Sequence, residues 1–434
     1  MRRLGIYVQV PFCQTKCTYC NFHTGVVAKE RFAPYVEALC REIRGHRELL
    51  KAAGVVWGSG PSKLRVNQWP LEARDKPVAP GRSETASGES DGAQFFVDTV
   101  YFGGGTPSLL EAEQLQRILQ AIRDAFATKG SGSVEVDGGC HGGFAEVTLE
   151  ADPETVEEGK AAAWARAGIH RVSFGVQSFS DEELKAAGRM HRRADIYRAV
   201  PILRAAGIRN ISFDLISGLP HQTKESWQQS LEELIALAPE HVSVYMLEVD
   251  EGSRLGKELL AGGTRYSARA VPSEDQMAEF YEMAKEALEA AGYRHYEISN
   301  WARPGFESKH NLKYWRREPY LGFGAGAHSF SGKQRWANAH DRAVYVDAIA
   351  RGRLRVEQLE DVSAEQALEE ELFLGLRQLQ GIDVRRIEME YGVAISERFE
   401  PLAAAGLVER EGDVVRLTER KLSVSNEVFV ELMK

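Results

Sequence analysis

The chain has 434 residues, a formal net charge of −9, 43% hydrophobic residues and 27% charged residues. No run of about 18 apolar residues could span a bilayer, the acidic balance argues against sequence-independent binding of nucleic acid, and five cysteines in so long a chain do not make a disulfide framework. We therefore expect a cytoplasmic protein with one large domain and one smaller domain. The sequence is compatible with peripheral membrane contact and with a homodimer.

The first feature along the chain is a group of three cysteines, Cys13, Cys17 and Cys20, which follows an apolar run over residues 5–10. Their C-x3-C-x2-C spacing supplies three thiolates, whereas a 4Fe–4S cluster is normally held by four. The pattern therefore predicts a cluster with one iron open to a small molecule. A structural zinc site is the alternative, because His23 would supply a fourth ligand of a type that zinc accepts.

Short β-branched runs alternate with helical stretches through the first half of the chain. Strands are expected over residues 5–10, 99–102, 146–150, 171–175, 210–215 and 241–247. Helices are expected over residues 30–50, 111–127, 154–167, 181–187, 195–206 and 225–236. This alternation is typical of a parallel sheet, so the sequence predicts an α/β fold with a partial (β/α)6 barrel.

Polar and small residues follow the ends of five of these strands. They are Cys13, the glycines at 103–105, Glu150, Gln177 and Asp214. Taken singly, the glycines could form only a tight turn and the carboxylates could be solvated side chains. Because barrels gather their chemistry at the carboxyl ends of their strands, we expect all five strand ends to meet at one site.

Two segments interrupt the alternation, at residues 57–94 and 129–144. The first is rich in Pro, Gly, Ser and mixed charge, a composition that buries little apolar area. The second is Gly-rich and includes Cys140 and His141, which we interpret as bystanders because no second ligand pair lies nearby in sequence. Both segments are predicted to be insertion loops at the surface.

The ordered motifs of the chain resemble those of the oxygen-independent coproporphyrinogen III oxidase family of radical S-adenosylmethionine (SAM) proteins, and within it the haem chaperone branch. The resemblance covers nearly the whole chain apart from the two insertions. Its motifs are PFCxxxCxYCNF, YFGGGTPS, LEADPET, RVSFGVQSF, GRMH, FDLISGLPHQT, YEISNWARPG, HNLKYW and YLGFGAGAHSF.

The resemblance implies a 4Fe–4S cluster on Cys13, Cys17 and Cys20, with SAM bound at its open iron. No catalytic residue is assigned. The positions that match the family's SAM contacts are Tyr7, Gly104, Gly105, Thr106, Glu150, Gln177, Arg189 and Asp214.

The choice between chaperone and oxidase depends on two features. The oxidase branch carries a further cysteine at the position of Phe22, whereas the motif HNxxYW of the chaperone branch begins here at His310. Because haem iron takes histidine as an axial ligand, His310 is the candidate haem ligand and His328 the second candidate. The resemblance thus implies a haem chaperone that passes haem to an acceptor protein, which the sequence does not identify. The alternative is an enzyme that catalyses radical oxidative decarboxylation of coproporphyrinogen III. A zinc-stabilised binding module is a third, weaker hypothesis.

The chain is expected to divide into three parts: the barrel domain over residues 1–300, a connecting segment with the HNxxYW motif over 301–360, and a smaller C-terminal domain over 361–434. The C-terminal domain is predicted to contain helices over 365–380, 384–391 and 395–405, followed by a hairpin over 407–417. This order of elements is winged-helix-like. The first helix of the domain is acidic, which suits a partner surface better than DNA.

Overall fold

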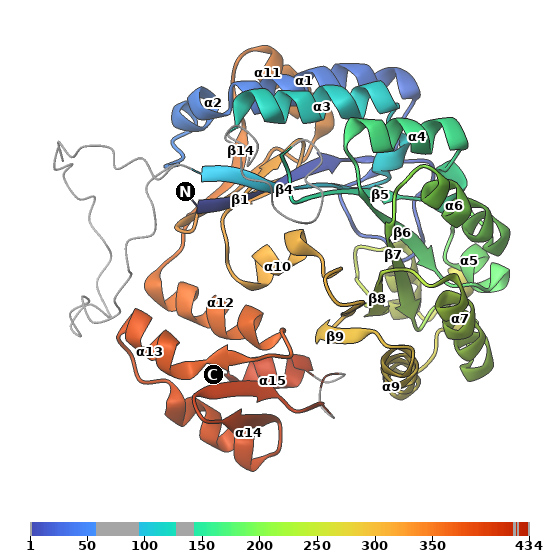
Figure 1. Cartoon of the computed structure of the whole chain (residues 1–434), viewed down its shortest axis with the longest axis vertical. Coiled ribbons are helices and arrows are strands. Elements are labelled where there is room, and N and C mark those ends of the chain that lie inside the picture. Colours follow the sequence, from blue (N-terminus) through green and yellow to red (C-terminus); the bar gives the residue numbers. More distant parts are fainter. Residues whose placement is uncertain (1, 58–94, 127–142, 420–421, 423–424, 433–434) are drawn as a thin grey trace.

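The computed structural model describes residues 2–57, 95–126, 143–419, 422 and 425–432. Six parallel strands form the centre of a twelve-stranded sheet that curves around a concave side (Figure 1). They are β1 (Arg2–Val10), β4 (Phe95–Gly104), β5 (Glu146–Ala151), β6 (Arg171–Gln177), β7 (Asn210–Ser217) and β8 (His241–Met246). All six expected strands are present, and the predicted partial (β/α)6 barrel is confirmed.

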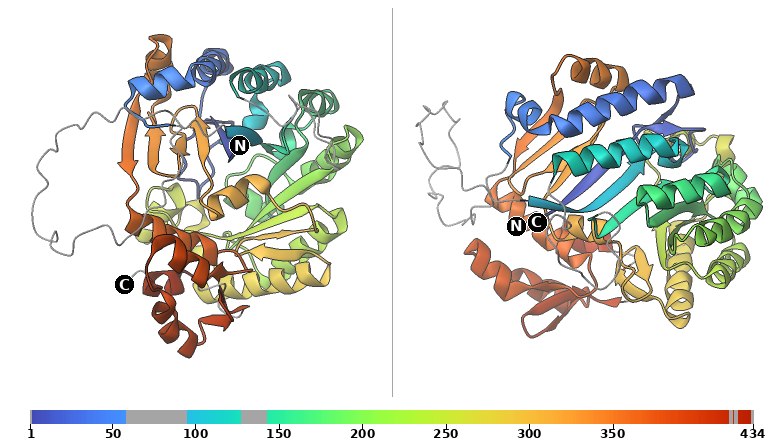
Figure 2. Two further views of the ribbon diagram at one scale, coloured as in Figure 1. Left: turned by 60° about the vertical axis from the view of Figure 1, so that its left-hand side comes forward. Right: turned by 45° about the horizontal axis from the view of Figure 1, so that its top comes forward.

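Helices cover the convex side of the sheet (Figures 1 and 2). They are α1 (Phe32–Arg44), α2 (His46–Ala52), α3 (Ala112–Ala125), α4 (Glu158–Ala167), α5 (Asp181–Ala186), α6 (Arg193–Ala205), α7 (Lys224–Leu237) and α9 (Glu274–Ala290). Helix α8 (Arg254–Leu260) instead contacts the cysteine loop, where Leu255 donates its N–H to the Thr18 carbonyl at 2.8 Å. The single helix expected over 30–50 is wrong, because the chain leaves helical geometry at Gly45 (φ −95°, ψ 12°) and starts α2 there.

Residues alternate across each parallel strand between the two faces of the sheet. One set is apolar and packs in the core, for example Val100 and Phe102 of β4 and Val147 and Leu149 of β5. The other set is polar although also buried, and includes Thr99, Thr148, Ser173, Ser212 and Ser243. The barrel therefore has a polar inner face that can support a site at the strand ends.

The segment expected to be a connection adds strands to the sheet. From it, β11 (Tyr320–Phe323) pairs in parallel with β1, and β12 (His328–Phe330), β13 (Gln334–Asn338) and β14 (Val356–Asp361) continue antiparallel. Helix α10 (Lys309–Trp315) lies on the concave side (Figure 1), and α11 (Arg342–Ala350) packs against α1. At the other edge, β10 (Asn300–Ala302) and β9 (Arg294–Glu297) are antiparallel.

The C-terminal part combines helices with a small sheet in the order β15-β17-β16. Its elements are α12 (Ala364–Leu376), β15 (Ile382–Asp383), α13 (Val384–Tyr391), α14 (Glu400–Ala404), β16 (Val408–Glu411), β17 (Val414–Leu417) and α15 (Ser425–Leu432). The helix expected over 395–405 is split into a 3-10 turn and α14. Glu370 of α12 forms ion pairs with Arg317 and Arg335, which join this part to the barrel.

Short 3-10 helices complete the description: Lys29–Arg31, Pro107–Leu109, Pro153–Thr155, Arg265–Ala270 and Ser396–Phe399. The predicted insertions at 57–94 and 129–144 lie almost entirely outside the described residues, as do Cys140 and His141. In the part of the chain that the structure describes, no helix has the length and apolar character needed to cross a membrane.

Candidate radical SAM site

The cysteine loop begins and ends at two short paired strands, β2 (Phe12–Cys13) and β3 (Gly25–Val26). Cys13, Cys17 and Cys20 are all half-buried in this loop. Burial raises the pKa of the Cys13 and Cys20 thiols, and a hydrogen bond from Thr24 acts in the opposite direction at both. Arg189 Nη1 donates to Cys17 Sγ at 3.6 Å, so a cation already faces one of the three sulfurs.

The position of His23 bears on the zinc alternative, in which it would be the fourth ligand. Its ring packs against that of His340 with a centroid distance of 4.2 Å. A zinc ion needs four ligand atoms within about 2.0–2.3 Å of one point, and among the described residues no three His, Cys, Asp or Glu side chains are gathered to hold a single ion. Three thiolates without a fourth protein ligand would leave one iron of a 4Fe–4S cluster open.

The glycine turn after β4 packs directly on the cysteine strand. Gly105 donates its N–H to the Val10 carbonyl at 2.9 Å. A Cβ at position 105 would lie 2.4 Å from the Phe12 carbonyl oxygen and 3.0 Å from Cys13 Sγ. Gly104 adopts φ +110°, a conformation that side chains rarely tolerate. Glycine is therefore required where the two strand ends approach each other.

Glu150, at the end of β5, accepts hydrogen bonds only from neutral donors in the described structure. Tyr101 OH donates to Oε1 at 2.8 Å and the Gly104 N–H to Oε2 at 3.0 Å. Burial raises the pKa of Glu150 to about 7. Tyr7, opposite Tyr101 in register, stacks on it at 6.0 Å and donates to Gln9.

Asp214 is a second, partly buried carboxyl that accepts hydrogen bonds from neutral donors, and the charge of Arg171 is close enough to act against the rise of its pKa. Ser173 donates to Oδ2 at 3.1 Å and Ser212 to Oδ1 at 3.5 Å. Burial raises the pKa of Asp214. Gln177, on the neighbouring strand, has φ +64°, which is uncommon for a residue with a side chain and is often found at functional sites.

Arg189 links the cysteine loop to the glycine turn through Asp152. Its guanidinium forms an ion pair with Asp152 and donates to the Gly175 carbonyl at 2.8 Å. Thr106 donates to the other oxygen of Asp152 at 3.1 Å. Sequence reasoning missed Asp152, although it lies directly after β5 and two residues from Glu150, which was already a candidate.

The structure thus brings the cysteines and the eight predicted SAM positions to the same end of the barrel or its inner face, whereas His310 lies on the far side of Tyr101, on which its ring stacks with a centroid distance of 5.2 Å. His310 is on α10 and only 1% exposed. Its Nδ1 is bonded to Thr99 Oγ1 and its Nε2 to Tyr314 OH, both at 2.9 Å, and burial lowers its pKa to about 3. Neither ring nitrogen is free to bind iron in this arrangement. His328, the second candidate, is exposed.

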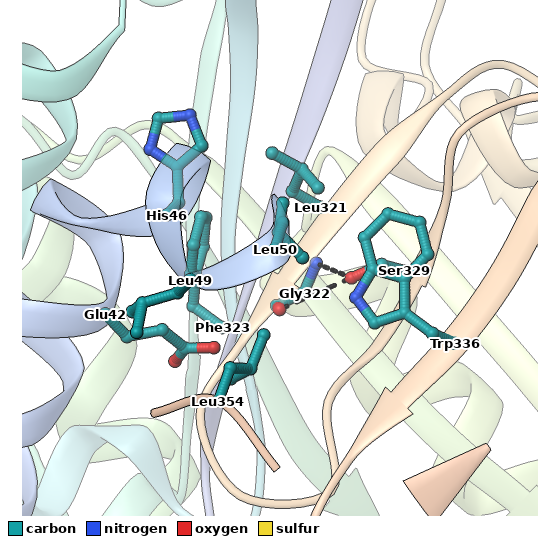
Figure 3. A pocket seen from close by; sticks show the side chains of 10 residues that line it. All are labelled: Glu42, His46, Leu49, Leu50, Leu321, Gly322, Phe323, Ser329, Trp336 and Leu354. Atoms are coloured by element: carbon teal, nitrogen blue, oxygen red, sulfur yellow. Dashed lines mark hydrogen bonds between the residues drawn. The ribbon is translucent and has the colours of Figure 1, made fainter. Parts of the chain in front are cut away.

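A small cavity elsewhere in the barrel does not belong to this site. Figure 3 shows it between α1, α2 and strands β11–β13, lined by Glu42, His46 and Trp336 among others. Its volume of about 10 Å³ has room for roughly one water molecule.

Comparisons with known proteins agree with this geometry. The family model for the radical SAM superfamily matches residues 89–234, and the model for the HemN C-terminal domain matches residues 362–422. The structure of coproporphyrinogen III oxidase (HemN) from Escherichia coli, a radical SAM enzyme, superposes with a TM-score of 0.75 at 20% identity, covering 99% of this chain and 90% of that one. The fold is that of a radical SAM protein.

Relatives with higher sequence identity identify the family within this superfamily. Heme chaperone HemW of Bacillus subtilis is 32% identical over 98% of this chain and 97% of its own length. Heme chaperone HemW of Mycobacterium tuberculosis is 32% identical over 99% of this chain and 94% of its own length. Heme chaperone HemW of Escherichia coli is 31% identical over 75% of this chain and 69% of its own length. The chain belongs to the HemW family of the radical SAM superfamily, and membership of the superfamily implies a 4Fe–4S cluster and SAM as cofactors.

Proposed function

We propose that this chain is a cytoplasmic haem chaperone that binds haem and passes it to an acceptor protein, with a 4Fe–4S cluster and SAM at the mouth of its barrel. The observation that carries the proposal is similarity over nearly the whole chain to proteins named heme chaperone HemW. The likeness to HemN is under a quarter identical and extends to the fold alone.

The thiolates of Cys13, Cys17 and Cys20 would hold the cluster. The donor set fits, since three sulfurs lie half-buried in one loop and the Arg189 guanidinium donates to one of them. A charge-assisted hydrogen bond of this kind stabilises the thiolate over the thiol. Together the cluster and SAM supply one-electron chemistry when bound.

The carboxyls of Glu150 and Asp214 would bind the cationic ligand. Both are partly buried and accept hydrogen bonds only from neutral donors, so each raised pKa would fall toward its ordinary value when a positive charge arrives. SAM carries a sulfonium and an ammonium group. We assign the remaining contacts to backbone and side-chain groups of Tyr7, Gly104, Gly105, Thr106, Gln177 and Arg189.

Phe22 argues against the oxidase alternative. The oxidase branch carries a cysteine at this position, whereas the Phe22 side chain here is 66% exposed and supplies no thiol.

The test uses anaerobically reconstituted protein in two parallel assays. Titration with haem should give a Soret shift, whereas coproporphyrinogen III with SAM and a reductant should yield no decarboxylated product. Product formation above that of a Cys17→Ser control would overturn the chaperone proposal, and the lack of a haem-dependent Soret shift would do the same.

A further inference from the structure

Three histidines meet on the surface beside the cysteine loop. His23 lies in that loop, His328 begins β12, and His340 follows β13; we call them the histidine cluster. The ring centroids of His23 and His340 are 4.2 Å apart, and those of His328 and His340 are 6.3 Å apart. His23 and His328 are exposed, and the His340 side chain is 27% exposed. Imidazole groups from two distant parts of the chain are therefore gathered at one accessible place.

Free ring nitrogens distinguish this cluster from His310. Within the described ranges, neither the His23 ring nor the His328 ring takes part in a hydrogen bond. His340 Nδ1 lies 3.3 Å from Glu357 Oε2, an arrangement in which a carboxylate orients a histidine as in many metal sites. Burial and the charge of His340 lower the pKa of His23 and His328, so both are neutral near pH 7, the form that binds iron.

The surroundings of the cluster match the other parts of a haem molecule. Phe22 lies in the cysteine loop and Val26 in the strand that ends it. Their side chains are 66% and 60% exposed and offer apolar surface to a flat ring. Lys16 is close enough to help lower the pKa of His23, so a cation is available to a propionate. Haem iron already has four porphyrin nitrogens and needs only one or two from the protein, so the three imidazoles need not converge on one point.

We propose that the histidine cluster is the surface on which this chain holds haem for transfer, with His23 or His328 as the axial ligand and His340 as a positioning residue. The inference rests on the proposed chaperone function and adds the location of the ligand. An exposed ligand suits transfer, because an acceptor protein can approach the iron without opening the barrel.

The experiment titrates the reconstituted protein with haem and follows the Soret band. The double variant His23→Ala/His328→Ala should bind haem at least about tenfold more weakly or with a shifted Soret maximum, since the axial nitrogen is lost. His340→Ala should change the spectrum less than the double variant. His221→Ala, which replaces a partly exposed histidine outside the cluster, is the matched control and should bind as wild type does.

Two further variants keep the test decisive. His310→Ala, with its iron content and melting temperature measured to show that it folds, should retain the wild-type Soret shift. Thr99→Val frees His310 Nδ1 without removing the ring and should also leave haem binding unchanged. If the double variant binds haem as wild type does, the cluster is not the haem surface, although the chaperone function stands. If wild type itself binds no haem, the proposed function fails.

Discussion

Polar side chains at the two ends of the barrel differ in their hydrogen-bond and ion-pair partners. At the base, below the strand ends, His310 has both ring nitrogens bonded, and Lys313 of the same helix pairs with Asp98 at 2.8 Å and Glu318 at 3.0 Å. At the mouth, Glu150 and Asp214 are partly buried and accept hydrogen bonds from neutral donors only. Networks whose hydrogen bonds are all made stabilise a fold, whereas carboxyls that accept only from neutral donors can still bind a cation.

The backbone shows the same contrast. The N-terminus of α10 is fixed at the base because Glu146 accepts the N–H groups of Lys309 and His310, each at 3.0 Å. At the mouth, the positive φ angles of Gly104 and Gln177 hold unusual conformations beside the cysteine loop. Substitutions at the mouth should therefore alter ligand binding, and substitutions at the base should alter stability.

The largest effect is expected for Cys17→Ser. Removing one of three thiolates should reduce the iron of reconstituted protein from about four per chain to nearly none, as measured by iron and sulfide analysis. His23→Ala is the matched control and should keep its iron, because its ring faces His340. Equal loss of iron in the two variants, or stoichiometric zinc, would restore the zinc alternative.

A severalfold loss of cluster iron is expected for Gly105→Ala. The added Cβ would lie 2.4 Å from the Phe12 carbonyl oxygen and 3.0 Å from Cys13 Sγ, so the cysteine strand must shift. Gly159→Ala, where a Cβ meets nothing within 4 Å, should reconstitute normally. Full iron content in the Gly105 variant would mean that the turn and the cysteine strand adjust independently.

A selective effect is expected for Glu150→Gln, which should weaken SAM binding roughly tenfold through the loss of a charged partner while leaving the iron content unchanged. Because the pKa of Glu150 is about 7, the carboxylate forms only as the pH rises past that value. Equilibrium binding of SAM to wild type should tighten from about pH 6 to about pH 8, and the variant should lack that dependence. A parallel pH dependence in the variant would assign the titration to another group.

Much of this architecture could be predicted because its signals are local. The β-branched runs gave all six parallel strands, and the rule that strand ends converge brought Cys13, Glu150 and Asp214 into one site. Asp152 was missed although its position, two residues after Glu150, carried the signal.

Other features depend on contacts that no local pattern shows. The burial of His310 depends on Thr99, which is 211 residues away in sequence. Strands β11–β14 are short and include a glycine-rich stretch that reads as a loop, so only their pairing beside β1 makes them strands. The break at Gly45 likewise interrupts a pattern that was helical on both sides.

The smallest effect concerns Glu42, a carboxyl that shares a pKa of about 7 with Glu150 but belongs to a saturated network. It is 2% exposed and accepts from Gly324 N, Asn338 Nδ2 and Tyr345 OH at 2.9, 2.7 and 2.6 Å. Burial raises its pKa, so between its unfolded pKa of about 4.5 and about 7 the folded state binds more protons than the unfolded state. The stability that this proton contributes is complete below that window and is lost as the pH rises through it.

Glu42→Gln should therefore reduce the fall in melting temperature of the protein between about pH 5 and about pH 8, by a degree or so to a few degrees. Glu37→Gln on the same helix is the control: its pKa is lowered by hydrogen bonds from Arg41 and Arg117, so it should not flatten the profile. The Glu42 variant should also bind SAM with wild-type affinity, since its network ties α1 to the β11–β13 region away from the strand ends. If the Glu42 variant weakened SAM binding as much as Glu150→Gln does, the proposed distinction would be wrong: Glu42 would not be a purely structural carboxyl and Glu150 would not be a specific ligand-binding one.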